Sequence, residues 1–140
     1  MTAWQCQDIL KLSVEQWTAA LKNPHIFNEQ ALNMVYFVYR QKDAQSTATA
    51  IAAYFSEDGP TIYQQTITAC NRHVAKALYK RYHVEPPVGD DGYRRYWNVV
   101  FDGNPEQPKD ASGHFYWRLR PHLNLALSAM TAGASSLPKQ

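Results

Sequence analysis

Apolar residues in the first part of the chain recur at spacings of three and four, the period of one face of a helix. This pattern predicts helices over residues 13–22, 28–41 and 46–55. Each range begins with side-chain oxygens that can accept hydrogen bonds from the first helical turn: Ser13, Asn28, and Ser46 or Thr47. The third helix is expected to end at Glu57-Asp58-Gly59-Pro60, because glycine and proline together interrupt helices.

From Thr61 the helical period returns and continues towards the loop that begins at Glu85. The apolar face of this long helix consists of Tyr63, Ile67, Cys70, Val74, Ala77 and Leu78. The opposite face consists of Gln64, Gln65, Thr68, Arg72, Lys76 and Tyr79. A helix, a short break and a second helix with a polar face are typical of a helix-turn-helix, although many α-hairpins have the same pattern.

Beyond the Pro- and Gly-rich loop at 85–92, the apolar period changes to two, which indicates strands. The side chains expected to face the core are Trp97, Val99 and Phe101 in one strand and Phe115, Trp117 and Leu119 in the other. A long polar loop at 103–113 joins these strands into a hairpin. Pro121 begins a last helix that carries Leu123, Leu125, Ala126, Leu127 and Met130.

The sequence therefore predicts an α+β fold that is mostly helical. We expect a winged helix, in which a helix-turn-helix is followed by a β-hairpin wing and a C-terminal helix. The 140 residues suffice for one domain with its own core. The expected organisation is an N-terminal helical extension at 1–27, a winged-helix DNA-binding domain at 28–132 and a flexible tail at 133–140.

The candidate chemistry is that of a binding protein and not of an enzyme. No GxSxG or Cys/His pattern supplies a nucleophile, and no Gly-rich loop opens a helix to hold phosphate. Asp102, Glu106 and Lys109 approximate the acids and lysine of a metal-dependent nuclease, but they fall in a proline-containing loop. We expect them to be solvated hairpin residues.

The cysteines, the histidines and the length of the apolar runs argue against a disulfide-rich, a metal-binding or a membrane protein. Cys6 and Cys70 are too few for a disulfide framework or a four-cysteine zinc site, so we expect small buried side chains. The five histidines lack metal-ligand spacing, and neither a metal nor a cofactor is expected. No apolar run approaches the roughly 20 residues of a membrane span, and no secretory signal is visible. The sequence predicts a cytoplasmic protein without membrane contact.

The net charge of +2 is distributed unevenly along the chain. Residues 1–60 carry four basic and six acidic side chains, whereas residues 61–140 carry ten and six. Six of the bases lie close together: Arg72, Lys76, Lys80, Arg81, Arg94 and Arg95. Such a stripe suggests contact with a polyanion, and a merely solvated helix face is an equally weighted alternative.

If the long helix belongs to a helix-turn-helix, its polar face would enter the major groove of double-stranded DNA. The side chains of types that hydrogen-bond base edges are Gln64, Gln65, Thr68 and Asn71. The expected phosphate contacts are Arg72, Lys76 and Lys80 along the helix, with Arg94 and Arg95 at the base of the hairpin. Outside that fold, the same residues would form an ordinary polar surface.

Four segments of the chain, taken in order, resemble a known family. They are Ala-Thr-Ala-Ile-Ala at 48–52, Tyr63 with Asn-Arg-His-Val-Ala-Lys-Ala-Leu at 71–78, Tyr-Trp-Asn-Val-Val-Phe-Asp-Gly at 96–103, and Phe-Tyr-Trp-Arg-Leu-Arg-Pro-His-Leu-Asn-Leu-Ala-Leu at 115–127. The series resembles the winged-helix domains that lie beside HNH nuclease domains in modification-dependent restriction endonucleases. Its most specific part is Trp-x-Leu-Arg-Pro-x-Leu-x-x-Ala-Leu at 117–127, and the resemblance covers about residues 28–130.

The resemblance implies a reader of modified DNA, N6-methyladenine among the modifications, that directs a nuclease to cut. This chain has no His-Asn-His metal motif, so it would be a separated reader domain or a stand-alone relative, with a nuclease domain in cis or in trans. The aromatic candidates for contact with a modified base are Tyr63, Tyr93, Tyr96 and Trp97. Burying one methyl group against them contributes about 1 kcal/mol.

Two other functions remain open at this point. One is a transcriptional regulator that binds DNA without regard to modification, and the other is a winged helix whose aromatic face binds a protein. The sequence does not decide which modification and flanking bases are read, whether the base is flipped, or whether the chain is part of a larger nuclease. The oligomeric state is also open, because the apolar helix at 28–41 is able to pack on a second copy.

Overall fold

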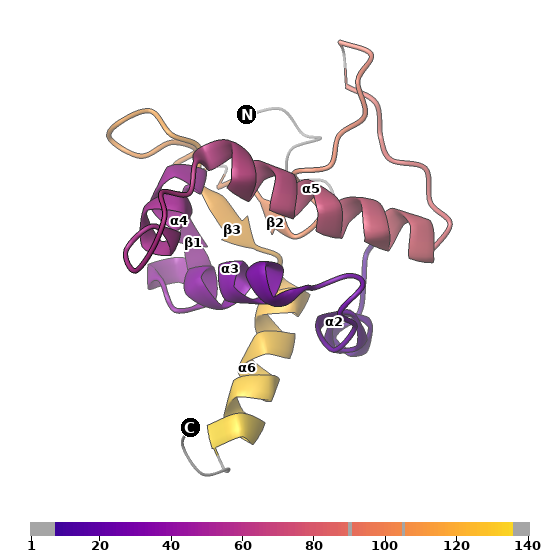
Figure 1. The fold of residues 1–140 in the computed structure, drawn as a ribbon. Helices are drawn as coiled ribbons and strands as arrows, with labels where there is room; N and C mark the ends of the chain where they lie inside the picture. Colours follow the sequence, from indigo (N-terminus) through magenta and orange to yellow (C-terminus); the bar gives the residue numbers. More distant parts are fainter. Residues whose placement is uncertain (1–7, 90, 105, 136–140) are drawn as a thin grey trace.

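The computed structural model of the chain describes residues 8–89, 91–104 and 106–135 (Figure 1). Within them the fold is α+β, as the sequence predicts, with a small three-stranded antiparallel sheet. The helices are α2 (Val14–Leu21), α3 (Glu29–Tyr39), η1 (Lys42–Ala44, a 3-10 turn), α4 (Ala48–Phe55), α5 (Gln64–Arg81) and α6 (Pro121–Ser135). The strands are β1 (Gln45–Ser46), β2 (Phe101–Asp102) and β3 (Trp117–Leu119).

The expected starts of the first three helices are confirmed. The hydroxyl of Ser13 accepts from the Gln16 N–H at 3.1 Å, and the Gln16 side chain accepts from the Ser13 N–H at 2.8 Å. These two bonds form a capping box. Asn28 caps α3 through the Ala31 N–H at 2.9 Å. Of the two candidates for α4, Thr47 is the cap, with the Ala50 N–H at 3.1 Å.

The sheet is ordered β1-β3-β2, so β3 lies between the other two strands. Arg118 of β3 is opposite Gln45 of β1 on one side and Asp102 of β2 on the other. The sequence pattern missed β1, because two residues are too few to show an alternation. Its position, between α3 and α4 in sequence but beside β3 in space, joins the helical half of the chain to the hairpin.

Residues of the five described α-helices, β2 and β3 share one hydrophobic core. α2 packs against α6, and Trp17 and Leu21 of α2 are buried in the same cluster as Phe101 and Leu123. The range expected to be an N-terminal extension therefore contributes to the core through its described residues, 8–27. Residues 1–7, which include Cys6, and residues 136–140 of the expected tail lie outside the described residues, whereas 133–135 continue α6.

The strand prediction was only partly correct. Residues 97–100 form turns, and β2 begins only at Phe101. Inward and outward positions do not alternate in a turn, and Asn98, Val99 and Val100 are all buried. Phe115, expected in the core, is 49 % exposed, and the Lys109 amine lies 4.8 Å from the centre of its ring.

Two connections project from the body of the protein at opposite ends of α5 in the view of Figure 1. One is the expected hairpin loop between β2 and β3. The other is the segment 84–97, which follows α5. Within it the Gly89 N–H donates to the Tyr93 carbonyl at 2.9 Å and the Arg95 N–H to the Pro87 carbonyl at 2.8 Å. This segment is therefore a second small hairpin, where the sequence indicated an irregular loop.

Candidate nucleic-acid interface

The start of α5 is a polar, exposed surface. Gln64 and Gln65 are exposed, as the sequence predicts. The Thr49 hydroxyl of α4 donates to the Gln64 side chain at 3.3 Å, and the Thr68 hydroxyl donates to the Gln64 carbonyl at 3.1 Å. The first of these bonds holds the first turn of α5 against α4, and the second lies within α5. The start of α5 thus offers amide and hydroxyl groups at the surface, of the kinds that hydrogen-bond to base edges.

Asn71 does not belong to that surface, so its expected contact with a base edge in the major groove, made from the exposed face of α5, is wrong for this structure. Only 1 % of the residue is exposed, and its side-chain Nδ2 donates to the Trp97 carbonyl at 3.1 Å. Position 71 lies one helical turn from the buried Ile67 and Val74, so it faces the interior once the chain after α5 folds back. Asn71 therefore fixes residue 97 against α5.

The basic side chains of α5 form an exposed row. Arg72, Lys76 and Lys80 follow one another at spacings of four, which places them on one face of the helix. α5 contains no acidic residue. The row is therefore free of compensating charge within its own helix, and it suits phosphate contacts. Tyr79, expected on the same polar face, is instead 3 % exposed, and burial raises the pKa of its hydroxyl to about 12.

Arg94 and Arg95 lie in the segment 84–97, beside α5 rather than at the base of the expected hairpin. Arg94 forms an ion pair with Glu85 at 2.7 Å, and Arg95 one with Asp91 at 3.0 Å. The Glu85 carboxylate raises the pKa of Arg94, while the Tyr93 N–H and the Arg95 guanidinium lower the pKa of Asp91. Each arginine is thus paired with a carboxylate of the same segment.

Two adjoining cavities lie between α5 and the segment 84–97. The larger, of about 530 Å³, is lined by residues that include Lys76, Lys80, His83, Glu85, Arg94 and Tyr96. The smaller, of about 160 Å³, is lined by Thr68, Asn71, Arg72, Arg94, Arg95, Tyr96 and Trp97. Arg94 and Tyr96 line both, so the two cavities form one basic groove with an aromatic ring between its halves.

The four aromatic candidates for contact with a modified base are not gathered in one wall. Tyr96 and Trp97 are half-buried and line the smaller cavity. Tyr63, which also departs from the expected apolar face of α5, is 65 % exposed at the start of the helix. Tyr93 is exposed in the hairpin of segment 84–97, and neither it nor Tyr63 lines either cavity.

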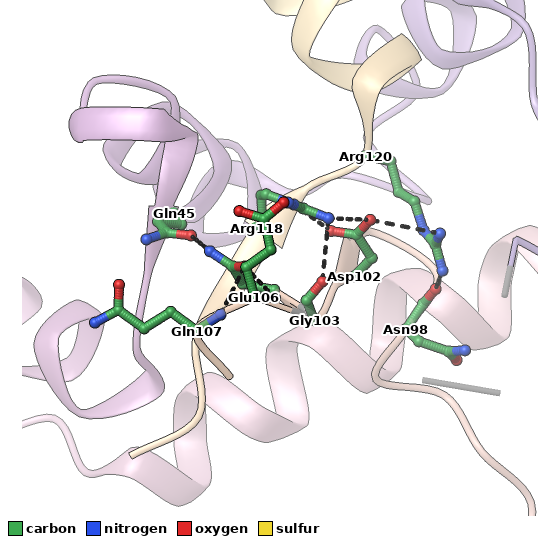
Figure 2. A network of polar contacts seen from close by, with 9 residues as sticks. Gln45, Asn98, Asp102, Gly103, Glu106, Gln107, Arg118 and Arg120 are labelled. Atoms are coloured by element: carbon green, nitrogen blue, oxygen red, sulfur yellow. Dashed lines mark hydrogen bonds and ion pairs between the residues drawn. The ribbon is translucent and has the colours of Figure 1, made fainter. Parts of the chain in front are cut away.

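A polar network at the base of the β2–β3 hairpin contains Asp102, one of the two acids that approximated a nuclease site in the sequence (Figure 2). Asp102 accepts two hydrogen bonds from Arg118, at 2.9 and 3.1 Å, and lies 4.0 Å from the Arg120 guanidinium. Arg118 also donates to the Gly103 carbonyl at 3.2 Å. Asp102 is thus buried in β2 and bound by arginines, so the expectation of a solvated loop residue is wrong for it. Within the described ranges, no group of three or more His, Cys, Asp and Glu side chains is suited to a metal ion.

Cys70 is buried in α5, as expected of a small core residue. Burial raises the pKa of its thiol to about 11, so the thiol stays protonated at neutral pH. A protonated, buried thiol is a poor nucleophile and a poor metal ligand. Its environment agrees with a packing role.

Sequence reasoning missed the groove because it treated residues 85–92 as a loop without partners. One signal was available: Asp91-Gly92 is a typical hairpin turn, and Gly92 has a positive φ of 83°. The alternation Tyr93-Arg94-Arg95-Tyr96 after this turn is the second half of the small hairpin. Nothing in the sequence indicated that the segment would pack along α5, because that contact is made by pairs distant in sequence, Asn71 with Trp97 and Tyr79 with Tyr96.

Comparisons with known proteins do not place the chain in a family. No protein-family model matches it, and neither a curated protein nor a solved structure is significantly similar to it. Among the residues described by the structure, no helix combines the length and apolar character needed to cross a membrane. The functional interpretation therefore depends on the chain's own residues.

Proposed function

We propose that this chain is a winged-helix protein that binds double-stranded DNA and reads a modified base, with N6-methyladenine favoured. The observation that carries the proposal is the order α3, β1, α4, α5, β2, β3 together with the sheet order β1-β3-β2. In a winged helix, the strand ahead of the helix-turn-helix pairs with the second strand of the wing hairpin. The same pairing joins β1 to β3 here.

The surface of α5 supports its role as the recognition helix. An α-helix fits the major groove, where amide side chains can bond to adenine edges. Gln64, Gln65 and Thr68 lie at the start of α5, and the row of Arg72, Lys76 and Lys80 continues from them. Base contacts at one end of a helix and phosphate contacts along the rest would fix its register on a duplex.

Tyr96 and Trp97 support the preference for a modified base. They lie beside Thr68 and Arg72, so an apolar surface adjoins the polar one. An N6-methyl group projects into the major groove, and its burial against a ring contributes about 1 kcal/mol. In this proposal the chain recruits a nuclease domain, in cis or in trans, to DNA that carries the modification.

Equilibrium binding to one duplex in three forms tests the proposal: unmodified, N6-methyladenine and 5-methylcytosine, at fixed salt. We expect at least a tenfold preference for the N6-methyladenine form, which corresponds to about 1.4 kcal/mol. The methyl group alone contributes about 1 kcal/mol of this, and contacts with the adenine ring would supply the rest. Gln65→Ala should weaken binding to all three forms, whereas Gln30→Ala on α3 is the matched control and should not.

Two results would contradict this proposal. Equal, salt-sensitive binding to the three duplexes would indicate a DNA-binding protein that ignores modification, such as a transcriptional regulator. Absence of binding to any duplex would overturn the DNA-binding function itself and favour a protein partner for the aromatic surface.

A further inference from the structure

We propose that the groove between α5 and the segment 84–97 binds one nucleotide, with its heterocyclic ring in the smaller cavity and its phosphate in the larger. A nucleotide extruded from a DNA duplex and a free nucleoside monophosphate share this chemistry. The duplex form of the inference rests on the proposed function, and the free-nucleotide form does not.

The smaller cavity has the size and the walls of a ring site. A cavity of about 150 Å³ is known to hold benzene, and this one measures about 160 Å³. Tyr96 and Trp97 supply aromatic surfaces against which a heterocycle can stack. The cavity is therefore matched to one aromatic heterocycle and is too small for a whole nucleotide.

Asn71 adds a polar group at the wall of this cavity. The residue is nearly completely buried, and its Oδ1 atom has no hydrogen-bond partner among the described residues. A buried acceptor without a donor is unfavourable. An N–H group of a bound heterocycle is a donor of the kind that Asn71 lacks, and the nearby Thr68 hydroxyl offers a second polar contact.

The larger cavity has the charge of a phosphate site. Lys76 and Lys80 reach it from α5, and Arg94 reaches it from the segment 84–97. The acidic residue in its lining is Glu85, whose carboxylate is already paired with Arg94 at 2.7 Å. Three cations against one carboxylate favour an anion, and a volume of about 530 Å³ leaves room for a sugar as well as a phosphate.

Tyr96 makes the two cavities parts of one site. This residue lines both of them, and the Lys76 amine lies 5.3 Å from the centre of its ring. A ring stacked on Tyr96 would thus have its phosphate within reach of Lys76. Tyr79 packs edge-on against Tyr96 at 6.3 Å, and Asn71 holds the Trp97 carbonyl, so both aromatic walls are fixed in place before a ligand arrives.

The first experiment uses the full chain and deoxyadenosine 5′-monophosphate, with binding measured by calorimetry and by NMR of the Asn71 side-chain amide and the Trp97 indole. We expect saturable binding that shifts both signals. Deoxyribose 5-phosphate, which lacks the ring, should bind at least tenfold more weakly. Equal binding of the two compounds would overturn the ring site.

A variant and its control distinguish phosphate binding in the groove from a general attraction between the nucleotide and a positively charged protein. Arg94→Ala should weaken nucleotide binding at least tenfold, because Arg94 lines both cavities. Arg40→Ala removes the same charge from an exposed position at the end of α3 and should change binding by less than twofold. Equal losses in the two variants would overturn the assignment of phosphate to the groove.

The second experiment distinguishes the two sources of the nucleotide. A duplex with 2-aminopurine at the target position becomes brighter when that base leaves the stack, so a severalfold rise on binding indicates extrusion. Nucleotide binding without this rise supports a free nucleotide as the ligand. Absence of both overturns the inference, even if the modified duplex is preferred. Conversely, nucleotide binding without any duplex binding rejects the proposed function and keeps the nucleotide site.

Discussion

Asp102 interacts with two guanidinium groups, more than any other described carboxylate near the hairpin. It is 7 % exposed, with the Arg118 guanidinium bound side-on and that of Arg120 at 4.0 Å. Gln45, Arg118 and Asp102 form one row across the three strands (Figure 2). The Asn104 amide donates to Gln45 at 3.0 Å. This row therefore lies where the hairpin joins β1, and we expect the stability of the fold to depend on it.

Replacing Asp102 tests that dependence. In Asp102→Ala two guanidinium groups lose their carboxylate, and removing one partner of a largely buried ion pair destabilises a protein by about 3 kcal/mol. We expect this loss in the free energy of unfolding measured by urea denaturation. The control is Glu106→Ala, an exposed acid in the same hairpin, which should stay within about 0.5 kcal/mol of the original chain. A similar, small change in both variants would show that the row does not support the fold.

The sequence predicted the burial of a side chain only where that burial depends on the period of a single element. Ile67, Val74 and Leu78 are buried as their spacing predicts. Asn71 and Tyr79 are buried against expectation, because the segment 84–97 covers a second side of α5 and widens its buried face. A helical period shows the centre of the apolar face and not its width, which depends on what packs beside it.

At the scale of elements, α5 differs from the helices that precede it. α2, α3 and α4 each begin with a side-chain cap, whereas α5 begins at Tyr63 without one. Tyr63 already has the extended backbone of an N-cap, with φ −96° and ψ 158°. A capping side chain would fit there without strain. The start of the proposed recognition helix is therefore less stable than it would be with a capping residue at position 63.

Tyr63→Asp should therefore stabilise the fold and weaken its proposed function. The carboxylate would accept hydrogen bonds from the first turn of α5 and interact favourably with the positive end of the helix dipole, which contributes about 1 kcal/mol to the free energy of unfolding. The same charge would repel DNA phosphates. We expect a higher melting temperature and lower duplex affinity, measured by calorimetry and by fluorescence anisotropy.

Tyr63→Ala controls for the loss of the aromatic ring. It removes the ring without adding a cap, so it should not raise the melting temperature. If Tyr63→Asp binds duplex as tightly as the original chain, the start of α5 does not approach phosphate, and the orientation proposed for α5 is wrong.

The sequence predicted the long elements better than the short ones. Helices of eight or more residues repeat their apolar period at least twice, and their caps add an independent signal. β1 and β2 have two residues each, and such short strands exist only because β3 pairs with both. For the groove beside α5, Asp91-Gly92 indicated the small hairpin, but its packing along α5 was not predictable, since the walls come from segments separated by an apparent loop.

For the whole molecule, the distribution of charge matters more than its total. The net charge is only +2, yet the exposed row of α5 adds three cations on one face. Several acidic residues in the rest of the chain lie outside this row, at α2, α3 and the turn before α5. A duplex is thus expected to meet one positive face of a nearly neutral protein, so attraction should be local and not a property of the net charge.

The dependence of duplex affinity on salt tests this local attraction. Each phosphate neutralised by a cation lowers the slope of log K against log salt by about 0.9. Lys80→Ala should therefore make the slope shallower by about that amount and weaken binding similarly on every sequence, because a phosphate contact carries no base information. Lys22→Ala at the end of α2 removes the same charge from an exposed position and should leave the slope unchanged. If both lysines alter the slope equally, the protein attracts DNA through its net charge, and α5 is not the face that meets the duplex.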